Sequence, residues 1–215
     1  YEEKDETPFR FGSFTTMGEL YVETGLNELR MSNYRRILSL DSAMVVVQFD
    51  KDGVQYQRKY FISYPDSVMV MKFTANQSGK QNLILSYCPN SEAKSNLRAD
   101  GKDGLVYTGV LDNNGMKFAF RIKAIHKGGT LEAENDRLIV KGADEVVFLL
   151  TADTDYKMNF NPDFKDPKTY VGNDPEQTTR IMMDQAVQKG YDELYRNHEA
   201  DHTALFNRVR LQLNP

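Results

Sequence analysis

From Met17 to about Asp155 the chain is a succession of short β-rich runs separated by turn signals about every 8–12 residues. Strands at this spacing, without helical segments between them, are typical of a sandwich or a barrel. We therefore predict a mainly β sandwich over residues 1–156. About eleven runs carry the pattern, at residues 18–24, 34–40, 43–49, 54–64, 67–75, 82–87, 106–111, 116–126, 130–134, 137–141 and 145–151.

Two of these runs indicate how the strands are layered. Residues 67–75 (SVMVMKFTA) are largely apolar at both alternating sets of positions, which favours a strand covered on both faces. Residues 116–126 (MKFAFRIKAIH) alternate apolar side chains with Lys117, Arg121 and Lys123, so we expect those three to face solvent. The polar stretch 89–104 has no such pattern and is predicted to be a loop.

The pattern changes after Asp155. Residues 157–173 are rich in Asn, Asp and Pro and read as a loop. Asp174 followed by Pro175 is a helix-start signal, and Gly190 interrupts the helical spacing that follows. We predict a loop and helical linker over 157–206, and a strand-like start of a further unit over 207–215.

Composition excludes several classes of protein. The chain has 215 residues, a formal net charge of −4 and no clustered basic surface typical of nucleic-acid binding. No apolar run approaches the ~20 residues that span a bilayer, so we expect no membrane contact. The single cysteine, Cys88, forms no internal disulfide, and we expect it to be a small buried side chain.

One motif suggests metal chemistry. His198-Glu199-Ala200-Asp201-His202 matches H-E-x-x-H on a helix, in which two histidines share a face and a glutamate activates a zinc-bound water. A catalytic zinc needs a third protein ligand, and His126 is the candidate, on another element. Because both histidines continue the apolar stripe of the helix, we favour a packed helix and keep a zinc hydrolase as an alternative.

Other candidate residues have simpler readings. Asp153 and Asp155 end a strand and favour a capped strand end over a metal or sugar site. Tyr56, Tyr60 and Phe61 could line a sugar site, but their spacing favours the core. We assign no catalytic, cofactor-binding or metal residue and expect no cofactor; an autonomous sugar-binding module stays open as a second function.

Three segments resemble the family 95 glycoside hydrolases. Residues 34–43 (YRRILSLDSA) resemble that family's Y-R-R-x-L-D-L-x-x-A segment, and residues 53–68 (GVQYQRKYFISYPDSV) its G-V-x-Y-x-R-E-x-F-x-S-x-P-D-x-V segment. The pattern from His198 to Leu213 resembles H-x-x-D-Y-x-x-L-F-x-R-V-x-L-x-L, in which His202 stands at a position that is usually Tyr. The zinc-like motif then arises by coincidence.

The resemblance implies a galactose-mutarotase-like sandwich that precedes a catalytic (α/α)6 barrel in the same polypeptide. It implies an enzyme that hydrolyses α-L-fucosides, or sometimes α-L-galactosides, with inversion, in which this domain is non-catalytic and packs on the barrel. It further implies bacterial glycan degradation, a periplasmic or secreted location, and a fucosylated glycan as a second candidate partner.

The chain departs from the family pattern at Lys59, which is usually Glu, and at Ser39, which is usually Asp. The chain starts at Tyr1 without Met and ends directly after a strand-like segment, so we expect a piece of a longer polypeptide. The family's N-terminal segment with Trp and P-I-G-N-G-R-L-G does not occur here, from which we expect exposed sheet edges or self-association.

Overall fold

The computed structural model describes residues 16–27, 29–89, 93–112, 114–134 and 136–209. In these residues the chain forms twelve strands followed by one long helix, α1. Their bounds are β1 Gly18–Glu23, β2 Met31–Ser39, β3 Met44–Lys51, β4 Val54–Ser63, β5 Val68–Ala75, β6 Gln81–Pro89, β7 Ala93–Ala99, β8 Gly104–Leu111, β9 Lys117–Lys127, β10 Thr130–Ala133, β11 Arg137–Ala143, β12 Glu145–Thr154 and α1 Pro175–Phe206.

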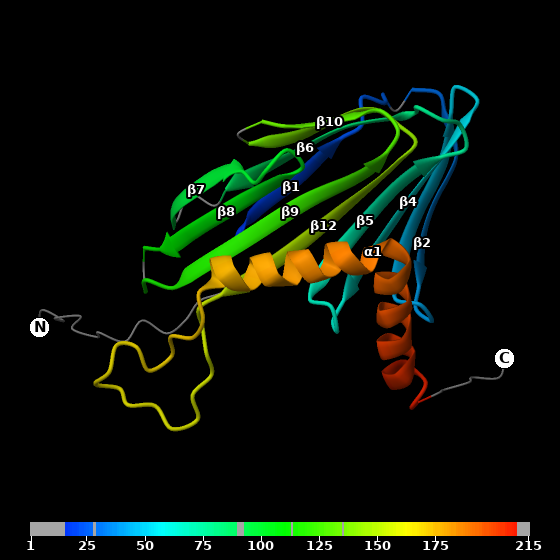
Figure 1. The fold of residues 1–215 in the computed structure, drawn as a ribbon. Helices are drawn as coiled ribbons and strands as arrows, with labels where there is room; N and C mark the ends of the chain where they lie inside the picture. The colour runs from blue at the N-terminus through cyan, green and yellow to red at the C-terminus, as the bar shows by residue number, and fades with distance from the viewer. Residues whose placement is uncertain (1–15, 28, 90–92, 113, 135, 210–215) are drawn as a thin grey trace, which may run out of the picture.

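The strands form two antiparallel sheets of unequal size. The larger has eight strands in the order β2-β3-β4-β5-β12-β9-β8-β7, and the smaller has four in the order β1-β6-β11-β10. Figure 1 shows the small sheet against one face of the large one and α1 across the other. The predicted mainly β sandwich with a C-terminal helix is confirmed.

The core between the sheets follows from strand alternation. Phe73 of β5 and Phe148 of β12 are at most 2% exposed and point toward the small sheet, where Leu85 and Leu138 are fully buried. Because alternate side chains of a strand point to opposite faces, the intervening residues of β5 and β12 point the other way.

Those intervening residues lie under α1. Val70 and Leu149 pack against Met183, Ala186 and Leu194 of the helix in a second apolar cluster. The two central strands are therefore covered on both faces, as the sequence of residues 67–75 predicts.

The helix begins and bends where the sequence indicates. Asp174 is the N-cap, its carboxylate accepts the Glu176 N–H at 3.1 Å, and Pro175 occupies the first turn. At Gly190 the backbone has φ 71° and ψ 171°, which divides α1 into two straight halves, and the second half turns down along the edge of the large sheet (Figure 1).

Three sequence-based expectations are wrong. Strand β7 lies inside the stretch predicted to be a loop; it is an edge strand whose only large apolar side chain is Leu97, so its sequence shows little apolar alternation. Arg121 is 2% exposed because α1 covers its face of β9, and its Nη1 donates to Asp100. Cys88 is exposed, because the preceding Tyr87 points inward on β6.

The remaining expectations concern the C-terminal part. Residues 157–173 form the predicted loop, with one isolated bridge between Tyr156 and Val171. The strand expected in 207–215 falls largely on residues 210–215, outside the described part of the chain. Among the described residues, no helix combines the length and the apolarity needed to cross a membrane.

The bend at Gly190 gives a first prediction. The φ and ψ there belong to a region that is nearly restricted to glycine, so Gly190→Ala is expected to destabilise the protein by about 1–3 kcal/mol. Urea unfolding followed by circular dichroism measures the change. Gln188→Ala, at an exposed position just before the bend, is the matched control and should be near neutral. An alanine at 190 that leaves stability unchanged or raises it, as in a regular helix, would contradict the bend.

Candidate functional site

The second half of α1 meets two turns of the large sheet at one place. One turn joins β2 to β3 at residues 40–43, and the other joins β4 to β5 at residues 64–67. We call this place the helix-docking site, and its parts are three groups of polar or aromatic side chains.

His198 occupies the centre of the helix-docking site. Its Nε2 lies 3.1 Å from the Ser42 carbonyl oxygen and 3.2 Å from that of Ala43, so this nitrogen donates to the β2–β3 turn. The ring is 5% exposed and stacks on Phe61 of β4, with centroids 4.9 Å apart. The histidine thus combines a hydrogen bond to the turn with burial against the sheet.

A column of stacked rings extends from His198 along the helix. His202 lies 6.4 Å from His198 and 5.1 Å from Phe206, measured between centroids, with interplanar angles of 18° and 24°. The His202 Nε2 lies 2.7 Å from the Leu40 carbonyl oxygen. Phe61, His198, His202 and Phe206 therefore form a continuous column, which we call the ring column.

Asp66 anchors the other turn. Its side chain is 2% exposed; Oδ1 accepts from Lys189 Nζ at 2.6 Å and from Asn197 Nδ2 at 3.1 Å, and Oδ2 accepts from Ser63 at 2.5 Å. Burial alone would raise the pKa of this carboxyl, but the hydrogen bonds from Lys189, Ser63 and Asn197 together lower it below its ordinary value. The charged form of Asp66 therefore stabilises the contact, and its donors come from both sides of the Gly190 bend.

Aromatic side chains fill the space between these anchors. Phe61 makes edge contacts with Tyr191 and Tyr195, and Lys72 Nζ lies 4.2 Å above the ring of Tyr191. Burial raises the pKa of Tyr191 to about 12. Lys72 also forms an ion pair with Glu145 at 2.8 Å, so its charge beside the aromatic cluster is neutralised by a carboxylate.

The helix-docking site gathers the three segments that resemble the glycoside hydrolase family. Residues 34–43 supply the turn carbonyls, residues 53–68 supply Phe61 and Asp66, and the segment from His198 supplies the histidines. The third segment follows the first two by more than a hundred residues in the chain, and a shared contact explains why each has a distinct pattern. Asp66, Lys189 and Asn197 were not singled out by sequence reasoning; the only signal for Asp66 was its place in the 53–68 segment.

The geometry assigns the zinc-like motif a packing role. The Nε2 atom of His198 and that of His202 each lie within hydrogen-bonding distance of a backbone carbonyl oxygen. Glu199 accepts a hydrogen bond from the Tyr195 hydroxyl at 2.9 Å. His126 bonds within its own hairpin, to the Gly128 carbonyl. Within the part of the chain that the structure describes, no three His, Cys, Asp or Glu side chains gather as a metal site would require.

The other candidate residues have structural partners. Asp155 accepts the Lys117 N–H at 2.9 Å and Asp153 the N–H of Thr154, so both cap the end of β12. Tyr56 is 7% exposed and stacks on Phe49, and Tyr60 packs on the core between the sheets. The prediction that these aromatic side chains lie in the core is confirmed.

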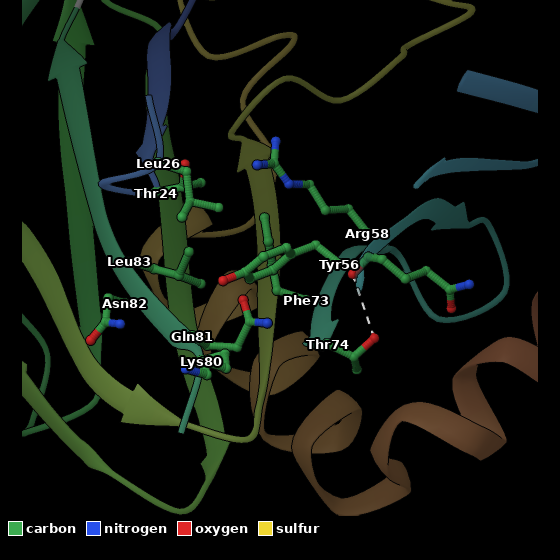
Figure 2. Close-up of a pocket in the computed structure, with 11 residues that line it drawn as sticks. Thr24, Leu26, Tyr56, Arg58, Phe73, Thr74, Lys80, Gln81, Asn82 and Leu83 are labelled. Atoms are coloured by element: carbon green, nitrogen blue, oxygen red, sulfur yellow. Dashed lines mark hydrogen bonds between the residues drawn. The ribbon is translucent and has the colours of Figure 1, made fainter. Parts of the chain in front are cut away.

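A small cavity lies between the two sheets near the start of β6. Figure 2 shows Thr24, Leu26 and Leu83 on one side and Tyr56, Arg58 and Phe73 on the other. The cavity measures about 10 Å³, enough for about one water molecule, and is too small for a sugar ring. Gln81 is 3% exposed at its edge.

A larger hollow lies beside the first turn of α1. It is an open groove of about 500 Å³ on the outer face of β7, β8 and β9. It is lined by seven polar residues, Lys94, Ser95, Asn96, Thr108, Lys117, Asp174 and Glu176, together with Gly109, Val110, Phe118 and Pro175.

Comparison with known proteins identifies a family. A family model described as "Glycosyl hydrolase family 65, N-terminal domain" matches residues 2–159. "Probable alpha-fucosidase A" of Aspergillus niger is 27% identical over 219 residues, covering 97% of this chain and 26% of the relative. "Alpha-L-fucosidase 2" of Arabidopsis thaliana is 26% identical over 227 residues, covering 94% of this chain and 26% of the relative.

A solved structure shares the fold. A protein described as "Putative kojibiose phosphorylase from human microbiome" superimposes with a TM-score of 0.59 at 10% identity, over 87% of this chain and 27% of that one. At this identity the likeness shows the fold alone. The chain spans about a quarter of the length of each of these proteins.

Asp66 gives a second prediction. Asp66→Asn is expected to lower the free energy of unfolding at pH 7 by about 1–3 kcal/mol, because Lys189 loses its buried anion. Since the folded pKa of Asp66 is lowered, its contribution is present above the unfolded pKa of ~3.8 and is lost as pH falls through the folded value. Urea unfolding of both proteins from pH 7 to pH 2.5 should show the difference shrinking toward acid. Asp184→Asn, on an exposed part of α1, is the control; a pH-independent difference would contradict the charge-based account.

The two histidines, His198 and His202, give a third prediction. Because both Nε2 atoms already donate to carbonyls, stoichiometric zinc is expected to leave the melting temperature unchanged. A site filled at 100 times its Kd would add about 2.7 kcal/mol, which a thermal melt detects readily. A saturable rise in the melting temperature that His202→Ala abolishes would restore the zinc alternative.

Proposed function

Because the chain belongs to the family of N-terminal domains of glycosyl hydrolase family 65, we propose that it is the non-catalytic supporting domain of a larger α-L-fucosidase-type glycoside hydrolase. Its role is to hold α1 in a fixed direction and to pack against the catalytic part of the same polypeptide, for which the family resemblance suggests an (α/α)6 barrel.

The helix-docking site carries this proposal. Asp66, the ring column and the apolar cluster under Met183 and Leu194 fix both halves of α1 on the sandwich. A helix held at this many points leaves the domain in a defined direction. That property suits a domain that positions a neighbour.

Fucoside specificity is supported by the two relatives, which are both named fucosidases and match nearly the whole of this chain. The catalytic residues, the inverting mechanism and the substrate belong in this proposal to the part of the polypeptide after residue 215. These relatives are fungal and plant proteins. A bacterial glycan-degrading origin and a periplasmic or secreted location remain predictions from the sequence, and cell fractionation would test the location.

The end of α1 provides the surface for the proposed contact. Leu205 and Val209 are 55% and 84% exposed, beside Phe206 at the end of the ring column. Exposed apolar side chains clustered at the end of a firmly held helix suit burial against a second domain.

A second candidate function rests on the open groove beside the start of α1. Its ammonium, amide, hydroxyl and carboxylate groups match the hydrogen-bonding groups of a sugar. A fucosylated glycan is the candidate ligand. Saturable binding of fucosyllactose in calorimetry, lost in Asn96→Ala, would favour a sugar-binding module over a purely supporting domain.

The supporting role gives a fourth prediction. In the full-length polypeptide, the double change Leu205→Ser and Val209→Ser is expected to lower the melting temperature several degrees more than it does in the isolated chain, because the contact is buried only there. Ile181→Ser, on the first half of α1 and 50% exposed, is the matched control. Equal effects in both proteins would remove this surface from the interface, and hydrolysis of an aryl α-L-fucoside by the isolated chain would overturn the non-catalytic role.

A further inference from the structure

The loop 157–173 carries large apolar side chains on its surface. Phe160 and Phe164 are 94% and 70% exposed, and Met158 is 57% exposed. Tyr156 and Val171, which form the bridge at the base of the loop, are 51% and 50% exposed. Side chains of this kind are usually buried, so their concentration in one loop indicates a surface for a partner.

The loop is held in shape by its own hydrogen bonds. The Asn159 Nδ2 donates to the Thr169 carbonyl oxygen at 3.1 Å, and the Thr169 hydroxyl oxygen accepts from the Asp163 N–H at 3.0 Å. At the base, the Lys157 N–H donates to the Tyr170 carbonyl oxygen at 2.7 Å. Because the loop is ordered before a partner binds, docking loses little conformational entropy.

The loop leaves the large sheet at the end where α1 docks. Strand β12 is antiparallel to β5, with Leu150 opposite Met69, so the end of β12 lies beside the β4–β5 turn. Asp66 of that turn accepts hydrogen bonds from α1. Figure 1 shows the loop and the second half of α1 extending below the strands, one at each end of the first half of α1. One partner can therefore contact both.

The distance between these two surfaces suits a folded domain. In the large sheet β12 and β2 are four strand spacings apart, roughly 19 Å at about 4.8 Å per spacing. Strand β2 leads into the turn that His202 contacts, and the exposed Leu205 and Val209 follow His202. A partner that covers the loop and these residues together must span about this distance, which a domain does and a single sugar ring does not.

The exposed apolar area has the size that such a contact needs. An aromatic side chain buries roughly 150–250 Å², so Phe160 and Phe164 together supply about 300–500 Å². Interfaces between domains of one chain bury about 600–1,500 Å². With Met158 and the apolar end of α1 added, the surface reaches that range.

The polar groups of the loop favour a protein surface over a sugar. The side chains of Asn159, Asp163 and Asp166 accept hydrogen bonds from backbone N–H groups of the loop itself. They therefore shape the loop, whose most exposed side chain is the ring of Phe160. A sugar ligand requires convergent hydrogen-bonding groups around its hydroxyls, whereas an apolar protein surface requires exposed rings.

We propose that the loop 157–173 is a docking element for the catalytic part of the same polypeptide. The proposal rests on the proposed function, which provides this partner, and adds a second contact to the one at the end of α1. The chain covers 26% of each fucosidase relative, so a polypeptide of their length has enough further chain to cover both surfaces.

Cysteine labelling tests the contact. In a Cys88→Ser background, Phe160→Cys, Val209→Cys and Leu29→Cys are made singly in the isolated chain and in the full-length polypeptide. Maleimide labelling at each position is followed by peptide mass spectrometry. We expect position 160 to react at least tenfold more slowly in the full-length polypeptide than in the isolated chain. Leu29 is 74% exposed at the opposite end of the large sheet and is the matched control, with equal rates in both proteins.

The position at the end of α1 separates failure of this proposal from failure of the proposed function. Protection of position 209 without protection of position 160 would overturn the docking role of the loop and leave the supporting role intact. Equal rates in both proteins at 160 and at 209 would overturn both. Protection that extends to position 29 would show that the effect is not specific to this end of the sheet and would also overturn the docking role.

Cross-linking identifies what covers the loop. Lys165 and Lys168 are exposed on the loop and react with a short amine-specific cross-linker. In the monomeric fraction of the full-length polypeptide, we expect linked peptides that join one of these lysines to sequence after residue 215. Protection of position 160 with links only between two copies of the polypeptide would show that a second copy covers the loop, which overturns the proposal.

Discussion

The structure depends on burial of the large sheet on both faces. The small sheet covers one face around Phe73 and Phe148, and α1 covers the other around Val70 and Leu149. Each buried apolar side chain of this size contributes about 1.5–3 kcal/mol relative to an exposed one, so neither face is a minor contributor. The helix belongs to the folding unit of the sandwich for this reason, although it follows the last strand by a twenty-residue loop.

Much of the fold could be predicted because its determinants are local. Strand alternation, the Asp174 cap and the Gly190 break each act within a few residues, and each was found where the pattern placed it. The exceptions have a non-local cause. Strand β7 gains its structure from pairing with β8 rather than from its own sequence, and Arg121 is buried because a helix more than fifty residues later lies over it.

The helix-docking site likewise combines features that could be predicted from the sequence with features that could not. The sequence supplied its three segments and a correct interpretation of His198 as a packed side chain, but not the contacts between them. Asp66 could not be found from periodicity, because a single carboxylate in a Pro-Asp turn resembles any other turn residue. Its role depends on Lys189 and Asn197, which only the bent helix brings together.

The ring column constrains the length of the chain as well as its composition. His198 and His202 lie 8 and 12 residues after Gly190, and a residue in an α-helix advances about 100° and 1.5 Å. One inserted residue between Gly190 and His198 would rotate both histidines about 100° away from the carbonyls of the β2–β3 turn. The length of the loop 157–173 does not set the rotation of the two histidines in this way. Homologous domains should therefore vary in length before the helix, while the spacing from the bend to the end of the ring column stays constant.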